Sequence, residues 1–213
     1  VPASWTEIPD FSFYRCTLLE TLTFETGSQL TKIGNYAFSF HPNRDWTSWD
    51  KRMGYSRLQN VNFPPSLTTI GEYAFASTSP GSVVIPESVT TIGEYAYSNC
   101  TFSDFAFINP SITKINKGTF AYTNLESFHV PLSVVHIDDD AFIGCEYLKS
   151  VEFRCNEEKL CIEPMSFTLT PLQTIAIPPN TEYVGNIPTT TLACSFVGMS
   201  CYNNTLACNC AGQ

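Results

Sequence analysis

A nine-residue segment of this chain recurs almost unchanged, and this internal repeat constrains the fold more than any other feature. Residues 67–75 read LTTIGEYAF and residues 89–97 read VTTIGEYAY. Weaker copies occupy residues 30–38, 112–120 and 134–142. Self-similarity at a period of about 20 to 50 residues is typical of architectures in which each unit stacks on its neighbours.

A central isoleucine marks each copy of the repeat. The marks are Ile8, Ile33, Ile70, Ile92, Ile115, Ile137, Ile162 and, last, Val184, separated by steps of 25, 37, 22, 23, 22, 25 and 22 residues. Five positions after seven of the eight marks stands an aromatic residue: Phe13, Phe38, Phe75, Tyr97, Phe120, Phe142 and Phe167. Only the last copy departs from this rule, with Thr189. The fixed offset indicates equivalent positions in equivalent units.

Each period contains short extended segments and tight turns. Segments such as residues 125–131 (LESFHVP) alternate apolar and polar residues before a proline, which is typical of a half-buried strand that ends there. A coil of about 22 residues cannot bury its apolar stripe alone, so successive coils should stack Ile on Ile and Phe on Phe. The sequence therefore predicts a mainly β solenoid of about eight coils over residues 1–190.

The repeat resembles a known family. Its pattern LxxφxφPxSφTxIGxxAFxxC, where φ is apolar, resembles the BspA-like class of leucine-rich repeats, found on bacterial and protist surface proteins. Cys16, Cys100 and Cys145 match the terminal cysteine of the pattern. The resemblance covers roughly residues 5–190 and implies a leucine-rich-repeat solenoid used for adhesion or surface interactions, without a shared catalytic site. It does not identify a ligand, because one fold hosts many functions.

Composition and charge exclude two classes of protein. The chain has 11 Lys+Arg against 20 Asp+Glu, a net charge of −9, whereas a nucleic-acid-binding protein needs a basic face. No run approaches the roughly 18 consecutive apolar residues that a membrane-spanning helix needs. The sequence therefore predicts neither a nucleic-acid partner nor a membrane span.

Several features favour an exported protein. Nine cysteines are many for a reducing cytosol unless they bind metal, and the sequence has no CxxC pair. The chain starts at Val1, as expected once a signal peptide has been removed. Asn99 and Asn203 lie in Asn-X-Thr glycosylation sequons. We therefore expect an extracellular or cell-surface glycoprotein.

The cysteines fall into two groups. Three lie in non-adjacent coils and are predicted to be buried free thiols: Cys16, Cys100 and Cys145. Six are predicted to form disulfides: Cys155 and Cys161 around one expanded coil, and Cys194, Cys201, Cys208 and Cys210 in a small cap over residues 191–213. The pairing within the cap stays open, and a bridge between subunits is an alternative.

The step of 37 residues contains an insertion, residues 41–57, with a distinct composition. It holds two of the three Trp and four of the eleven Lys+Arg. Insertions in a solenoid often form the binding face, and Trp, Tyr and Arg dominate interface energies. We predict a contact loop, with folding of the Trp side chains back onto the array as the alternative. The candidate partner-binding residues are Arg44, Trp46, Trp49, Arg52 and Tyr55, together with Tyr73 and Tyr95 from a column of tyrosines.

No catalytic or metal-binding motif is recognisable. The sequence lacks GxSxG, HExxH, P-loop and GxGxxG motifs, and the run of three aspartates at 138–140 lacks the alternating ligands of a calcium loop. We therefore predict a non-catalytic protein without metal or cofactor. It would bind a protein or glycan partner, or its own copies in a head-to-tail filament. The alternatives are the ligand-recognition ectodomain of a receptor and, less favoured, a hydrolase with an unrecognised site.

Overall fold

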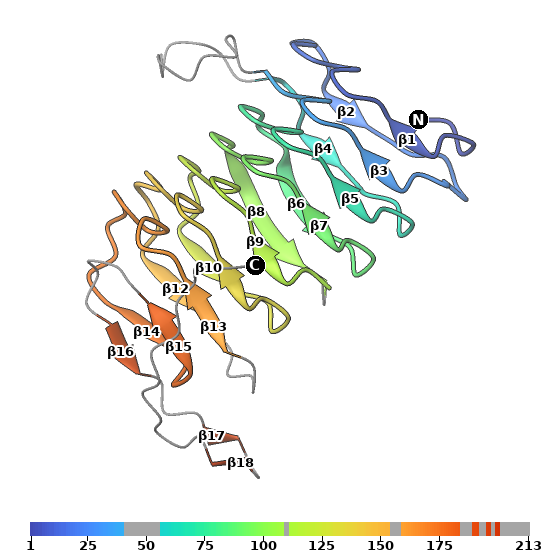
Figure 1. The fold of residues 1–213 in the computed structure, drawn as a ribbon. Helices are drawn as coiled ribbons and strands as arrows, with labels where there is room; N and C mark the ends of the chain where they lie inside the picture. Colours follow the sequence, from blue (N-terminus) through green and yellow to red (C-terminus); the bar gives the residue numbers. More distant parts are fainter. Residues whose placement is uncertain are drawn as a thin grey trace.

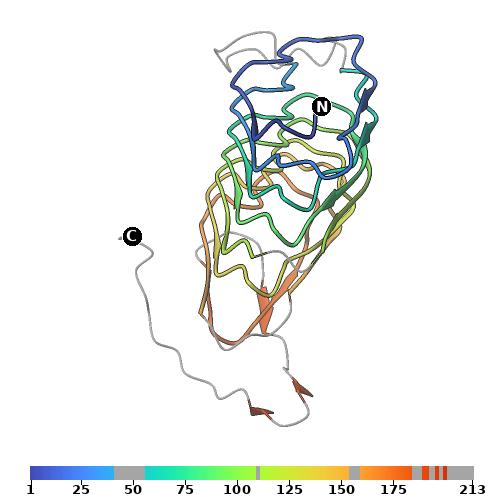
Figure 2. The same cartoon turned by 90° about the vertical axis from the view of Figure 1, so that its right-hand side faces the viewer.

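The chain forms a solenoid of stacked parallel strands. The computed structural model describes residues 1–40, 56–108, 111–153, 159–183, 189–191, 195–196 and 199–200. In this part of the chain about seven coils follow one another along a single axis, without a helix, so the predicted β solenoid is confirmed with one coil fewer than expected (Figure 1). The view turned by 90° shows the outlines of the coils nested behind one another (Figure 2).

The strands are short and lie in two rows. The first row consists of β1 (Glu7–Ile8), β3 (Lys32–Ile33), β5 (Thr69–Ile70), β7 (Thr91–Ile92), β9 (Lys114–Ile115), β11 (His136–Ile137), β13 (Leu160–Ile162) and β15 (Thr181–Tyr183). The second consists of β2 (Thr21–Leu22), β4 (Asn60–Val61), β6 (Gly81–Ile85), β8 (Phe102–Phe107), β10 (Ser127–His129), β12 (Ser150–Glu152), β14 (Ile175–Ile177) and β16 (Thr189–Thr191). A separate antiparallel pair consists of β17 (Ser195–Phe196) and β18 (Met199–Ser200).

The strand registers confirm the predicted ladder of isoleucines except at the step from Ile92 to Ile115, where β7 and β9 are not paired. Direct partners in the first row are Ile8 and Ile33, Ile33 and Ile70, Ile70 and Ile92, Ile115 and Ile137, and Ile137 and Ile162. The eighth mark was wrong, because Tyr183 and not Val184 lies opposite Ile162. Two apolar residues are adjacent at this point, so only the pairing of β13 with β15 decides which of them continues the ladder.

The core contains a continuous column of stacked rings. Successive ring centroids from Phe13 to Phe167 lie 5.1, 5.1, 5.4, 6.1, 5.4 and 5.2 Å apart, with interplanar angles of 16° or less. The aromatic positions predicted from the sequence therefore form one ladder. Phe75, Tyr97 and Phe142 have no exposed surface at all. Burial of such side chains contributes roughly 1.5–3 kcal/mol each.

Glycine after the central isoleucine permits the close approach of neighbouring coils. A Cβ on Gly71 would lie 2.7 Å from the backbone nitrogen of Asn35, and Gly34 and Gly93 have equally close backbone neighbours. The amide of Gly71 donates to the carbonyl of Ile33 at 2.8 Å. At Gly71 a side chain would therefore collide with the backbone of the preceding coil unless that backbone shifted.

One junction in the stack differs from the others, and we call it the seam. Strand pairing stops there on both rows, between β7 and β9 and between β8 and β10. Side-chain amides bridge the gap: Asn116 Nδ2 donates to the Ile92 carbonyl at 2.6 Å. Asn124 accepts from the amide of Phe102 at 2.7 Å and donates to its carbonyl at 2.9 Å. The seam therefore lacks strand pairing and has these side-chain bridges instead, while backbone hydrogen bonds between the turns, such as that from the Tyr97 amide to the Thr119 carbonyl at 3.0 Å, continue across it.

Buried cysteines and threonines alternate in one column of the core. Cys100 Sγ lies 3.5 Å from Thr78 Oγ1, and Cys145 Sγ lies 3.3 Å from Thr123 Oγ1. Burial raises the pKa of Cys100 to about 12 and that of Cys145 to about 11. The prediction of buried free thiols is thus confirmed for these two residues. Cys16 is also free, but its predicted burial was wrong, because it belongs to the first coil and is exposed.

Because neighbouring coils stack in register, Thr123→Cys should place its sulfur within bonding reach of Cys145. We expect an oxidised disulfide with one free thiol fewer than the parent and an unfolding free energy higher by about 3 kcal/mol. Thiol titration in denaturant and urea unfolding test this. The matched control is Thr119→Cys, which has no cysteine in its column and should instead add one free thiol.

Tyr97 is the one tyrosine in the ring column, and its hydroxyl is buried without a hydrogen-bond partner in the described residues. Tyr97→Phe should therefore raise the unfolding free energy by about 1–2 kcal/mol near pH 7. Burial also raises the pKa of Tyr97. The folded chain thus keeps a proton that the unfolded chain releases above pH 10, so the parent loses stability as pH rises further.

The Tyr97→Phe variant should show a smaller loss of stability between pH 9 and pH 11 than the parent. Urea unfolding at pH 7, 9 and 11 measures both effects. A variant less stable than the parent at pH 7 would mean that the hydroxyl is satisfied in solution.

Candidate functional site

A row of aromatic side chains follows the turn that leads out of the first strand row. The row consists of Phe11, Tyr36, Tyr73 and Tyr95, and we call it the aromatic row. Neighbouring ring centroids lie 4.9, 4.7 and 4.9 Å apart with interplanar angles of 4°, 16° and 0°. The two predicted binding residues Tyr73 and Tyr95 are therefore brought into direct contact.

The backbone of the aromatic row is held in the left-handed region. The φ angles of Tyr36, Tyr73 and Tyr95 are 55°, 52° and 54°. Such a conformation costs a non-glycine residue about 1–2 kcal/mol. Inter-coil backbone hydrogen bonds offset this cost. The Tyr36 amide donates to the backbone carbonyl of Glu72 at 2.8 Å, and the Tyr73 amide donates to the backbone carbonyl of Glu94 at 2.9 Å. The shared backbone conformation therefore orients the rings of the aromatic row in the same way.

The aromatic row ends against a glycine. A Cβ on Gly118 would lie 2.1 Å from Cε1 of Tyr95, so the ring occupies the space that any larger residue would need. Gly118 has a φ of 61°, which glycine adopts without strain. The far side of the Tyr95 ring is thus covered by the backbone of the next coil.

Acidic and amide side chains run beside the aromatic row. Asp10 Oδ1 accepts from the amide of Asn35 at 2.7 Å, and Asn35 Oδ1 accepts from the amide of Glu72 at 2.9 Å. The two exposed carboxylates that continue this column, Glu72 and Glu94, form no ion pair with any residue of the described part of the chain. We call them the acidic pair.

The charge near the acidic pair is negative. Burial chiefly raises the pKa of Tyr73, and the neighbouring tyrosines and the acidic pair raise it further. The described lysines are already occupied by carboxylates elsewhere: Lys32 by Glu7, Lys114 by Asp138, Lys117 by Asp140, Lys149 by Glu126 and Lys159 by Glu182. Few described cations therefore remain to neutralise Glu72 and Glu94.

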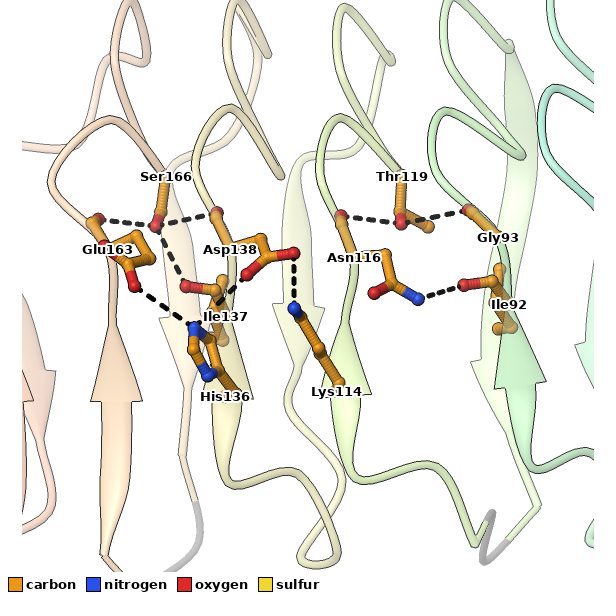
Figure 3. Close-up of polar contacts among 10 residues, drawn as sticks. All are labelled: Ile92, Gly93, Lys114, Asn116, Thr119, His136, Ile137, Asp138, Glu163 and Ser166. Carbon is orange, nitrogen blue, oxygen red and sulfur yellow. Dashed lines mark hydrogen bonds and ion pairs between the residues drawn. The ribbon is translucent and has the colours of Figure 1, made fainter. Parts of the chain in front are cut away.

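A second group of polar side chains follows the strands β9, β11 and β13 (Figure 3). Beyond the seam, Asn116, Asp138 and Glu163 stand where the earlier coils have glycine. Ser166 Oγ lies 2.6 Å from the Glu163 carbonyl and 3.0 Å from the Asp138 carbonyl and links these two coils. The larger residues thus fit because a hydroxyl side chain bridges the turn.

Charged and titratable groups converge in this second group. His136 Nε2 lies 3.2 Å from Asp138 Oδ1 and 3.3 Å from Glu163 Oε1 (Figure 3). The other oxygen of Asp138 pairs with Lys114 Nζ at 2.8 Å. Donor atoms of His136, Cys161 and Glu163 all lie within 4.8 Å of one another, an arrangement that could hold a cation. Cys161 is disulfide-bonded, so its sulfur does not act as a thiolate.

The repeat pattern alone does not predict that these donors meet. His136, Asp138 and Glu163 fit no known metal motif, and Glu163 reaches the others only because β11 and β13 pair in register. The signal that could have found them is the departure from glycine at three successive repeat positions, Asn116, Asp138 and Glu163.

The remaining predicted site residues are the glycosylation sequons, the contact residues of the inserted segment and the cysteines of the cap. Asn99 Nδ2 donates to Ser77 Oγ at 3.1 Å, so a glycan on Asn99 would replace this inter-coil contact. The predicted contact residues Arg44, Trp46, Trp49, Arg52 and Tyr55 lie outside the described residues, as do Cys155, Cys194, Cys201, Asn203, Cys208 and Cys210. The disulfide-rich cap and glycosylation at either asparagine therefore stay predictions. In the described ranges no helix is long and apolar enough to cross a membrane.

Comparisons with known proteins agree with the repeat. A family model described as a BspA-type leucine-rich repeat region matches residues 1–47 and 53–149 in six copies. A search of the curated proteins finds no match.

Three solved structures are similar to the chain. A leucine-rich repeat protein from Bacteroides ovatus has a TM-score of 0.53 and 22% identity, over 84% of this chain and 48% of that one. The pneumococcal vaccine antigen PcpA has a TM-score of 0.40 and 18% identity, over 86% of this chain and 57% of that one. A leucine-rich cell surface protein from Faecalibacterium prausnitzii has a TM-score of 0.23 and 20% identity, over 87% and 78%. The first likeness indicates a shared fold, and this chain spans about half of that protein.

Proposed function

The chain belongs to the BspA-type leucine-rich repeat family, and from this premise we propose that it is a non-catalytic interaction module on a cell surface or outside the cell. It binds a protein partner through the aromatic row and the acidic pair. The observation that carries the proposal is a rigid set of stacked rings beside two carboxylates without an ion pair in the described residues. The proposed location rests on the family and on the cysteine and sequon content of the sequence.

The partner chemistry follows from the orientation of the rings. Tyr36, Tyr73 and Tyr95 stack face to face, so their inner faces are covered by one another. A sugar that stacks on an open ring face would therefore bind poorly here. Ring edges and phenol hydroxyls can instead contact a polypeptide. Tyrosine provides contact area at low entropic cost, and stacking fixes the rings before binding. The acidic pair favours Lys or Arg in the partner.

The inserted segment lies next to this surface in the chain. Residues 41–57 connect to the coil through Phe40 and Ser56, whose amides donate to Ala76 and Ser77 of the neighbouring coil. That coil also contains Tyr73. We therefore propose, from their place in the sequence, that Arg44, Trp46, Trp49, Arg52 and Tyr55 contribute to binding the same partner.

Removal of the acidic pair should weaken binding of a basic peptide. We expect Glu72→Gln with Glu94→Gln to raise the Kd of a fluorescein-labelled Lys/Arg-rich peptide about tenfold at low salt, a loss of about 1.4 kcal/mol. Fluorescence anisotropy measures the Kd, and the difference should shrink with added salt.

A charge-matched double variant controls for the overall charge. Glu87→Gln with Asp104→Asn removes two exposed carboxylates that no described ion pair uses and that lie away from the aromatic row. This control should leave the Kd nearly unchanged. Equal weakening by both double variants would reduce the effect to net charge and contradict the proposed surface.

Self-assembly is the competing function, and the molar mass in solution separates the two. If the chain binds a partner as a single molecule, light scattering should give a monodisperse species near the chain mass of 23.7 kDa. Fibres in negative-stain images, or a mass that grows with concentration, would replace partner binding with head-to-tail assembly.

A further inference from the structure

The ring nitrogen Nε2 of His136 makes no hydrogen bond to a described residue, although two carboxylates lie close to it. Two carboxylate oxygens lie 3.2 and 3.3 Å away, yet the atom is fully covered and makes no hydrogen bond. At such distances an N–H directed at either oxygen would form one, so the nitrogen is directed at neither. A buried polar atom of this kind calls for an unseen partner, such as a water or an ion.

We propose that His136, Asp138 and Glu163 bind one divalent transition-metal ion, with Zn²⁺ the best match. Imidazole nitrogen and carboxylate oxygen bind Zn²⁺ at about 2.0–2.2 Å, and two such ligands in a tetrahedral site lie roughly 3.3 Å apart. The separations of 3.2 and 3.3 Å from Nε2 match this value, whereas Asp138 is not among the donors that lie within 4.8 Å of one another, so its carboxylate has to turn toward Glu163 when the ion binds. The three side chains are 28%, 20% and 24% exposed, so the ion can enter and a water can complete the site.

The surrounding contacts hold these donors in place. β11 pairs with β13, which fixes Asp138 and Glu163 at the same ends of neighbouring strands. Ser166 Oγ links the carbonyls of these two residues (Figure 3). Lys114 Nζ holds Asp138 Oδ2 at 2.8 Å and leaves Oδ1 toward the histidine. Such outer contacts orient metal ligands and tune their affinity.

The local charge also favours a divalent ion. Two carboxylates face one lysine, so with a neutral histidine the group carries an excess negative charge. A proton on His136 would neutralise this excess as well, and it competes with the metal for the same nitrogen.

Cys161 lies beside the site but does not contribute a thiolate. Its sulfur is within 4.8 Å of the His136 and Glu163 donors, and it is disulfide-bonded. The oxidised protein therefore offers nitrogen and oxygen ligands only. A bound Co²⁺ ion should accordingly show no thiolate charge-transfer absorption.

Titration of the oxidised full chain with ZnCl₂ in reductant-free buffer at neutral pH tests the proposal, after free thiols are blocked with iodoacetamide. Calorimetry should show one site. His136→Gln and Glu163→Gln should each raise the Kd for Zn²⁺ at least about tenfold. His129→Gln is the matched control, because His129 is exposed and pairs with a single carboxylate, Glu152, at 3.0 Å.

Two readouts keep the proposal falsifiable if a variant folds poorly. On the parent chain alone, Co²⁺ should give the intense visible bands of a four-coordinate site, and Zn²⁺ should raise the Tm. A solvated, six-coordinate Co²⁺ spectrum, absence of Zn²⁺ binding by the parent, or equal Zn²⁺ affinity in a folded His136→Gln variant would each overturn it.

Discussion

In-register contact between neighbouring coils is the constraint on which the rest of this structure depends. Each coil donates backbone hydrogen bonds to the next, and the short strands have too few residues to be stable alone. The close approach requires glycine at positions such as Gly71, where the preceding coil leaves no room for a Cβ. Once the spacing is set, every repeated residue type becomes a column. The isoleucine ladder, the ring column and the alternating Thr–Cys column are all products of this one geometric rule.

The same rule builds the exposed surfaces. A left-handed backbone at Tyr36, Tyr73 and Tyr95 would be a local cost in an isolated turn, but here each amide is satisfied by the following coil. The rings are stacked before any partner arrives, so little side-chain entropy is left to lose on binding. In-register contact between coils thus orders the surface rings as well as the core. Beyond the seam, glycine gives way to Asn116, Asp138 and Glu163, and the surface changes from aromatic to polar.

The sequence predicts much of this fold because a solenoid converts periodicity directly into contact. Ile70 and Ile92 are 22 residues apart and lie side by side, which a reader of the repeat can state in advance. Tyr73 and Tyr95 follow by the same reasoning. The His136–Asp138–Glu163 group does not, because its donors break the consensus and meet only through the register of β11 and β13. The exposure of Cys16 and the pairing of Tyr183 with Ile162 concern the first and last described coils, where the repeat pattern alone does not decide burial or register.

The seam gives this solenoid a mechanical character that an ideal array would lack. In stacked repeats each unit is coupled only to its neighbours, so rupture starts where coupling is lowest. Strand ladders are interrupted on both rows at this junction of the described chain, which leaves the hydrogen bonds between the turns and the amides of Asn116 and Asn124 to connect the two blocks. A pulling force along the axis acts equally on every junction, so we expect the seam to open first and the molecule to extend as two blocks of unequal composition. For a protein tethered to a surface, such a breaking point sets how much tension the tether transmits before it lengthens.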